Sequence, residues 1–213
     1  VTPWMTLYHW ELPQALEEKD GWQNSETAAA FSRFAAMMAA HFEGRVSHFI
    51  TLNEPQIVLK LGYADGIHAP GKRLSLPELV SCWKNLMLAH GLSFRAIRKA
   101  APEALIGIAS TGKLCYPHSP ADEDAARQET FRLTDSDWMF THAIVLDAVC
   151  LGRDEPEAGA LRKLLSEVTP EEWDTMHAVP DFIGVNSYNG SEIAAGPDGA
   201  PVYLPRPQGF ACT

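Results

Sequence analysis

The chain contains one segment in which an amide and a carboxyl group directly follow an apolar run. Residues 46–52 are β-prone, and Asn53, Glu54 and Pro55 come directly after them. Because proline has no N–H for a strand ladder, Pro55 predicts that a strand ends here. A carboxyl group can transfer a proton while a neighbouring amide binds a ligand. The alternative is a polar turn in which both side chains are solvated.

Two other β-prone runs end in side chains that suit a sugar. Residues 4–10 end in His9 and Trp10, and residues 181–188 end in Tyr188. An imidazole nitrogen can bond to hydroxyl groups, and an aromatic face can cover the apolar C–H surface of a sugar ring. A histidine at a strand end can also be a packed structural residue. Because three strand ends share this polar and aromatic character, we favour binding roles for these three side chains.

The strands that would position these side chains alternate with helices. The fourth β-prone run covers residues 105–110, and helical patterns separate all four runs. This alternation predicts parallel strands with helical crossovers, because tight hairpins cannot join parallel neighbours. The wide spacing of the runs favours an α/β fold of the (β/α)8 TIM-barrel type. In such a barrel the C-terminal strand ends form the catalytic face.

Caps and apolar stripes predict where the helices lie. A stripe over residues 27–42 predicts a helix that Asn24 or Ser25 caps. Ser75 and Glu78 have the spacing of a capping box, which predicts a helix to about residue 100. Further helical segments are expected over residues 122–149 and 157–167 and from residue 170 onwards, and a loop over residues 196–207.

Composition and motifs exclude several classes of function. The chain has 17 Lys and Arg against 27 Asp and Glu, a net charge of −10, so we expect no nucleic-acid partner and no membrane surface. Its four cysteines form no C-x-x-C pair and its histidines no metal motif, so we expect no metal and no cofactor. No membrane helix or signal-peptide pattern stands out, which favours a cytoplasmic protein.

One segment partly matches the sequence pattern of a phosphate-binding loop. Residues 66–72 have the glycine and lysine spacing of such a loop. However, Arg73 stands where a Mg²⁺-binding Ser or Thr is needed, and Pro70 removes a backbone N–H that would face the phosphates. We therefore do not predict nucleotide binding.

Taken together, the motifs resemble glycoside hydrolase family 1, which contains β-glucosidases, β-galactosidases and their 6-phospho relatives. The resemblance rests on these blocks, in chain order: Tyr8-His9-Trp10-Glu11-Leu12-Pro13-Gln14-Ala15-Leu16, Gly21-Trp22, Thr51-Leu52-Asn53-Glu54-Pro55, Gly62-Tyr63, Gly66-Ile67-His68-Ala69-Pro70-Gly71 and Asp181-Phe182-Ile183-Gly184-Val185-Asn186-Ser187-Tyr188. The resemblance implies that residues 1–213 form a single partial (β/α)8 barrel catalytic domain. This domain would cover about the third to sixth strand-helix units and lack the first and last.

The resemblance also implies a role for each candidate residue. The family is one of retaining β-glycosidases, and a β-glucosidase acting on terminal non-reducing β-D-glucosyl residues is the favoured member. Glu54 would then be the general acid/base. Asn53 would bind the sugar 2-hydroxyl and His9 the 3-hydroxyl side. Trp10 would form a wall of the same subsite, and Tyr188 would hydrogen-bond the nucleophile. The expected partner is a small β-glucoside or oligosaccharide.

The sequence departs from the family pattern at several points. Gln56 stands where family members usually have Trp, and residues 110–112 read Ser-Thr-Gly where an Asn is usual. The family's nucleophilic Glu lies in a Thr-Glu-Asn-Gly block, which residues 1–213 do not contain. A retaining mechanism needs two carboxyl groups about 5 to 5.5 Å apart. We therefore expect residues 1–213 alone to be inactive.

Two alternatives stay open at this point. A non-catalytic carbohydrate-binding remnant of a barrel would keep a sugar platform without a second carboxylate. A fragment of a 6-phospho-β-glycosidase would share the same early motifs. The sequence decides neither between glucose and galactose nor the oligomeric state.

Overall fold

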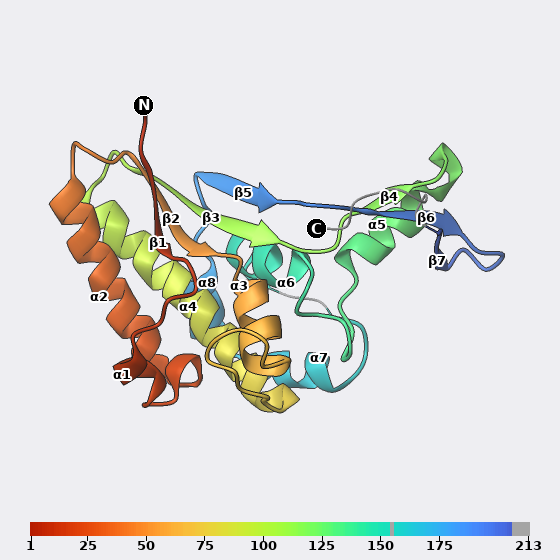
Figure 1. Ribbon diagram of the computed structural model, residues 1–213, viewed down its shortest axis with the longest axis horizontal. Helices are drawn as coiled ribbons and strands as arrows, with labels where there is room; N and C mark the ends of the chain where they lie inside the picture. The colour runs from red at the N-terminus through yellow and green to blue at the C-terminus, as the bar shows by residue number, and fades with distance from the viewer. Residues whose placement is uncertain (154–155, 206–213) are drawn as a thin grey trace.

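Four parallel strands form the central sheet of the computed structural model, which describes residues 1–153 and 156–205 (Figure 1). In spatial order they are β1 (Trp4–Tyr8), β2 (His48–Asn53), β3 (Leu105–Thr111) and β5 (Phe182–Asn186). All three neighbouring pairs are parallel, so the C-terminal ends of the strands share one rim. The structure confirms all four predicted strands and the α/β class with a parallel sheet.

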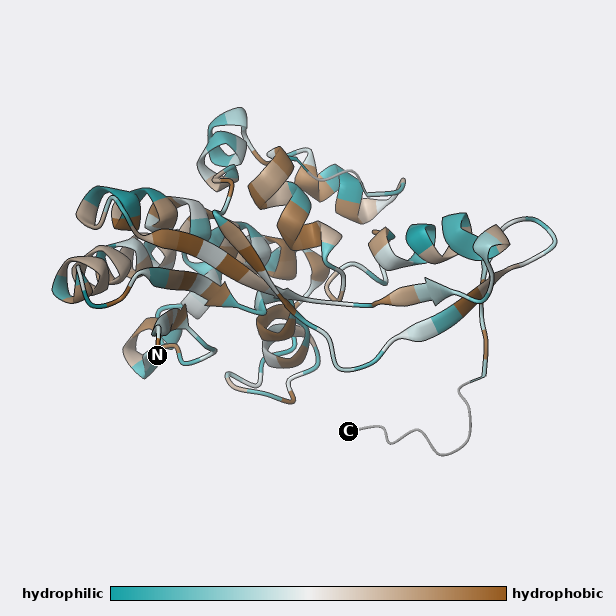
Figure 2. Cartoon of the chain, turned by 90° about the horizontal axis from the view of Figure 1, so that it is seen from above, coloured by the Kyte–Doolittle hydropathy of each residue, from teal (hydrophilic) through white to brown (hydrophobic). Residues whose placement is uncertain are grey.

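Two long helices pack against the sheet and against each other. These are α2 (Ser25–Phe42) and α4 (Leu76–Ala100). The Asn24 side chain caps α2 by accepting the Glu26 N–H, and the Ser75–Glu78 capping box begins α4. Both predicted helix starts are confirmed. Figure 2 shows hydrophobic residues concentrated along the strands that these helices cover.

The remaining helical segments are short. They are α1 (Gln14–Glu17), η1 (Gly21–Gln23), α3 (Pro55–Ile57), η2 (Val58–Ala64), η3 (Pro120–Asp122), α5 (Glu123–Phe131), α6 (Ala143–Leu146), η4 (Asp147–Leu151), α7 (Ala160–Leu165) and α8 (Pro170–Met176). The segment expected over residues 122–149 is thus divided into several pieces. The helix expected over residues 157–167 is shorter, because Gly159, with φ +151°, precedes its first residue.

A small second sheet projects from one end of the molecule (Figure 1). It consists of β4 (Cys115–Pro117), β6 (Ser191–Ala195) and β7 (Pro201–Tyr203), and α5 packs on it. Sequence patterns did not predict this sheet, and the loop expected over residues 196–207 is wrong for β7; residues 206–207 lie outside the described residues. These strands have only three to five residues, and β4 pairs with a strand far along the chain, so local patterning gave little indication of them.

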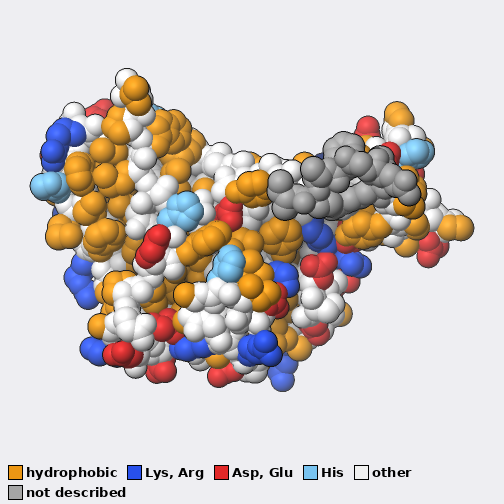
Figure 3. All heavy atoms as spheres, in the orientation of Figure 1, with side chains coloured by type: hydrophobic (Ala, Val, Ile, Leu, Met, Phe, Trp, Pro, Cys, Tyr) orange, Lys and Arg blue, Asp and Glu red, His pale blue; other side chains and the backbone are white. Residues whose placement is uncertain are grey.

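Apolar side chains remain exposed on parts of this fold. On β5, Ile183 and Val185 are exposed, and on α2 so are Phe34 and Met37. Figure 3 shows hydrophobic side chains gathered at the left of the molecule, over its N-terminal elements. In the described part of the chain, β1 and β5 are the two edges of the central sheet.

Three features bear on the excluded functions. Across residues 1–153 and 156–205, no helix is long and apolar enough to cross a membrane. Within the same ranges, no group of three or more His, Cys, Asp and Glu side chains is arranged to hold a metal ion. Cys82, Cys115 and Cys150 are free thiols, and Cys212 lies outside the described residues.

Candidate active site

The Asn53-Glu54 pair lies at the C-terminal end of β2. Asn53 is the last residue of the strand, and Glu54 turns the chain in a left-handed conformation (φ 47°, ψ 60°) before Pro55 begins α3. The Glu54 N–H donates to the carbonyl of Ala109 in β3 at 2.8 Å. The two side chains are only 7% and 4% exposed. This burial excludes a solvated polar turn and leaves a buried carboxyl group at the rim of the sheet.

Asn186 joins this pair from the end of β5. Its Nδ2 donates to Oε1 of Glu54 at 2.5 Å and to Oδ1 of Asn53 at 3.2 Å. Because Oε1 accepts this bond, the other carboxyl oxygen of Glu54 is the one available to carry a proton. From the sequence, Asn186 was part of a resembling block but was assigned no role. The available indication was its position as a polar residue at the end of the fourth strand.

His9 and Trp10 follow the end of β1, and Trp10 contacts the same pair. The Trp10 indole Nε1 donates to the carbonyl of Asn53 at 3.0 Å. The His9 and Trp10 rings meet edge to face, with centroids 5.5 Å apart. His9 is exposed and Trp10 is half-buried. The structure therefore joins the indole of Trp10 to the end of β2, and His9 contacts the ring of Trp10.

Backbone strain concentrates at this site. Trp10 has φ 81° and Glu54 has φ 47°, and they are two of the three non-glycine residues with positive φ among those described. A left-handed conformation costs about 1–3 kcal/mol for such residues and is found where the surrounding structure enforces it, commonly at functional sites. The Trp10 indole donates to the carbonyl of Asn53, the residue directly before Glu54.

Tyr188 lies apart from this group. It follows β5 on a bend and is 78% exposed, and no hydrogen bond joins it to Glu54 within the described residues. It lines a cavity of about 480 Å³ together with Thr111, Gly112 and Asn186. Asn186 therefore both lines this cavity and hydrogen-bonds to the carboxyl group of Glu54.

The back of β2 is held by a buried histidine. His90 in α4 lies 2.7 Å, through Nδ1, from the Thr51 hydroxyl, and its Nε2 lies 3.0 Å from the carbonyl of Ala178. Burial lowers the pKa of His90 to about 4. The imidazole is therefore uncharged at neutral pH. It joins β2, at Thr51, to the carbonyl of Ala178.

The two departures from the family pattern contact each other. Gln56 Nε2 donates to the Ser110 hydroxyl at 2.7 Å, and this hydroxyl also lies 2.9 Å from Nδ1 of His142. Burial lowers the pKa of His142. All three side chains are buried directly behind the turn that carries Glu54.

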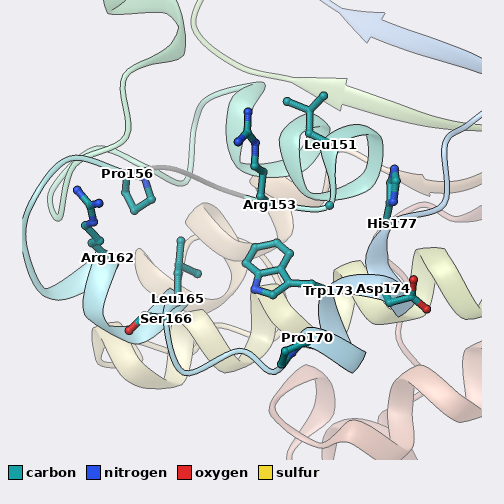
Figure 4. A pocket seen from close by; sticks show the side chains of 11 residues that line it. Leu151, Arg153, Pro156, Arg162, Leu165, Ser166, Pro170, Trp173, Asp174 and His177 are labelled. Carbon is teal, nitrogen blue, oxygen red and sulfur yellow. The ribbon is translucent and has the colours of Figure 1, made fainter.

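Another cavity lies away from these residues. It has a volume of about 590 Å³ and opens between the end of η4, α7 and α8, where Trp173, Leu165 and His177 line it (Figure 4). None of the candidate residues from the sequence lines it. We therefore place the candidate active site at the rim around Glu54.

Comparisons with known proteins identify the family of this chain. Residues 1–201 match the profile described as Glycosyl hydrolase family 1. Beta-glucosidase A of Thermotoga maritima is 32% identical over 202 residues, which cover 93% of this chain and 43% of that protein. Beta-glucosidase 25 of Oryza sativa subsp. japonica is 36% identical over 213 residues, covering 88% of this chain and 40% of that protein.

Solved structures give the same result. The β-glucosidase from Thermotoga maritima in complex with glucoimidazole has a TM-score of 0.77 at 30% identity, covering 97% of this chain and 46% of that one. Its complex with castanospermine has a TM-score of 0.76 at 29% identity, covering 97% and 45%. The chain thus spans less than half the length of these relatives. From the family profile and these relatives together, the chain belongs to glycosyl hydrolase family 1.

Proposed function

We propose that the protein is a retaining β-glucosidase with Glu54 as its general acid/base. The observation that carries the proposal is the buried Glu54 carboxyl group at the C-terminal rim, with one oxygen fixed by Asn186. A general acid must present its proton in one direction, toward the leaving oxygen. The named relatives are β-glucosidases, which supports terminal β-D-glucosyl residues as the substrate group.

In the proposed reaction, Glu54 protonates the glycosidic oxygen while a second carboxylate attacks the anomeric carbon. Glu54 then removes a proton from water, which hydrolyses the glycosyl-enzyme. The family's nucleophilic Glu lies in a Thr-Glu-Asn-Gly block, which residues 1–213 do not contain. We therefore place the nucleophile outside residues 1–213 and expect these residues alone to be inactive.

The sugar would lie over the residues that surround Glu54. Asn53 accepts the Asn186 bond through Oδ1, so its Nδ2 donors can meet the 2-hydroxyl. His9 would bind the 3-hydroxyl side, and the Trp10 ring would form the adjacent wall. Tyr188 would reach the nucleophile. A small β-glucoside or an oligosaccharide fits this arrangement.

The fold supports a closed barrel around this site. Among the described residues, β1 and β5 are the edge strands, on which further parallel strands can pair, so we assign the four strands to about the third to sixth units of a (β/α)8 barrel. Residues 1–213 then form part of one catalytic domain. A cytoplasmic location stays a prediction from the sequence.

Hydrolysis of 4-nitrophenyl β-D-glucoside by the protein in its natural full length tests the proposal. Glu54→Gln should lower kcat/KM by about 100-fold or more, because general acid catalysis contributes roughly 10²–10⁴-fold. The control is Glu11→Gln, which removes an exposed carboxylate beside Trp10. Equal activity of Glu54→Gln and the wild type would contradict the assignment. Sugar binding without turnover by the wild type would favour the carbohydrate-binding alternative, and turnover of the 6-phospho-glucoside alone would favour the 6-phospho-glycosidase.

A further inference from the structure

Gln56 is a fully buried amide directly behind the Glu54 turn. Its exposure is 0%, yet both ends of its amide are hydrogen-bonded. Nε2 donates to the Ser110 hydroxyl at 2.7 Å and to the Thr141 carbonyl at 3.3 Å, while Oε1 accepts the Thr111 N–H at 3.5 Å. A buried amide satisfied at each end fixes the segments it joins, because breaking any of these bonds leaves a buried polar group unpaired.

These bonds fasten the turn to three successive residues of β3. The Glu54 N–H donates to the carbonyl of Ala109, and the Gln56 amide contacts the side chain of Ser110 and the N–H of Thr111. The turn is therefore held on both sides of Pro55. Since Glu54 has a left-handed backbone, which is unfavourable by itself, such a clamp keeps the carboxyl group in one orientation.

The clamp continues to a second loop. The Ser110 hydroxyl lies 2.9 Å from Nδ1 of His142, and the Thr141 carbonyl accepts from Gln56. His142 directly precedes α6. The Gln56 amide thus connects the turn that carries Glu54, the end of β3 and the loop before α6, which are far apart in the sequence.

We propose that Gln56, acting through Ser110, is a positioning residue that aims the Glu54 carboxyl group at the leaving-group oxygen. The proposal rests on the proposed function of Glu54. Gln56 does not touch the reacting atoms; it fixes the peptide that carries Glu54. Its loss should therefore impair proton delivery and leave the sugar contacts of His9 and Asn53 in place.

This role predicts a dependence on the leaving group. 2,4-Dinitrophenolate leaves without protonation, whereas phenolate needs a proton from the general acid. The protein in its natural full length is assayed with both aryl β-D-glucosides, and kcat/KM is compared because it reports the steps up to glycosyl transfer. Gln56→Met, which keeps the side-chain length, should lower kcat/KM about 10- to 100-fold for phenyl glucoside and less than about threefold for the dinitrophenyl substrate.

A matched control separates positioning from general destabilisation. Asn85 in α4 is also a buried amide, and it donates to the Trp22 carbonyl at 2.8 Å, away from Glu54. Asn85→Leu should lower the melting temperature as Gln56→Met does, but change both substrates by the same factor. Ser110→Ala provides a milder variant that is expected to fold even where Gln56→Met does not. Ser110→Ala should also lower kcat/KM selectively for phenyl glucoside, but by a smaller factor than Gln56→Met.

The outcomes distinguish the two proposals. Equal losses on both substrates in Gln56→Met and Ser110→Ala, with a selective loss in Glu54→Gln, would overturn the role of Gln56 alone. If Glu54→Gln itself affects both substrates equally, the acid/base assignment fails. Selective losses in all three variants, with none in Asn85→Leu, are the expected result.

Discussion

The side-chain amide of Asn186 donates to Oε1 of Glu54 at 2.5 Å and joins residues 132 positions apart in the chain. The same nitrogen donates to Asn53, so one amide from the end of β5 orients both polar side chains at the end of β2. β3 lies between these two strands in the sheet. The contact therefore spans β3 at the rim of the sheet.

Replacement of Asn186 tests the value of this contact. Asn186→Leu keeps the approximate side-chain size and removes both hydrogen bonds. Because Glu54 then loses the partner that fixes Oε1, kcat/KM for 4-nitrophenyl β-D-glucoside should fall about 10- to 100-fold. The control is Asn189→Leu, at an exposed position three residues later. Equal effects of the two substitutions would show that Asn186 does not orient Glu54.

Trp10 should contribute mainly to sugar affinity. Trp10→Phe keeps an aromatic ring and removes the N–H that the Asn53 carbonyl accepts. Because this bond orients the ring, its loss should weaken the contact of the ring with the sugar by about 1 kcal/mol, which corresponds to about a fivefold weaker Kd for glucoimidazole. Calorimetric titration measures this Kd. Trp173→Phe, in the remote cavity, should leave it unchanged, and an unchanged Kd in Trp10→Phe would remove Trp10 from the sugar subsite.

The lowered pKa of His90 should make the stability of the fold depend on pH. Burial lowers its pKa in the folded state to about 4 from the ordinary value of 6.5. Between these values the unfolded chain binds a proton that the folded chain does not, so stability is complete above pH 6.5 and falls as the pH approaches 4. At pH 5 the loss is about 2 kcal/mol.

Urea unfolding at pH 7 and pH 5 measures this dependence. The wild type should lose about 2 kcal/mol more than His90→Gln over this interval. His41→Gln, which replaces an exposed histidine in α2, should behave like the wild type. If His90→Gln keeps the full pH dependence, other groups cause it.

Gly107 should be required inside the sheet. A Cβ atom at this position would overlap the ring of Phe182, which also packs against Trp4 with ring centroids 4.8 Å apart. Gly107→Ala should therefore lower the free energy of unfolding by about 1–3 kcal/mol through overpacking. Gly184→Ala is the control, because a Cβ atom added at this position would come no closer than 3.3 Å to another atom, the Cβ of Ala109. A smaller loss in Gly107→Ala than in Gly184→Ala would contradict this account.

Sequence patterns predicted the parts of this fold that local chemistry determines. The four strands are continuous β-prone runs, and the starts of α2 and α4 follow from Asn24 and the Ser75–Glu78 capping box. The Asn53-Glu54 pair was found because a proline directly follows it. Its burial and its contact with Trp10 agree with a site at the rim.

The parts that were missed depend on long-range contacts. β4 and β6 are short strands about 75 residues apart, so only their pairing shows them to be strands. Asn186 lies two residues before Tyr188, to which the family resemblance assigned a role. Its contacts with Glu54 and Asn53 become visible only in the folded structure, where the ends of β2 and β5 lie at the same rim. Gln56 was seen as a departure from a pattern, and only its contact with Ser110 explains how a buried amide is accommodated there.

The most direct test of the central claim is azide rescue of Glu54→Ala in the protein in its natural full length. With 2,4-dinitrophenyl β-D-glucoside, the variant should form the glycosyl-enzyme but hydrolyse it slowly, because no base activates water. Azide needs no base, so it should restore turnover and yield β-D-glucosyl azide. Absence of rescue, or formation of the α-azide, would contradict Glu54 as the acid/base of a retaining β-glucosidase.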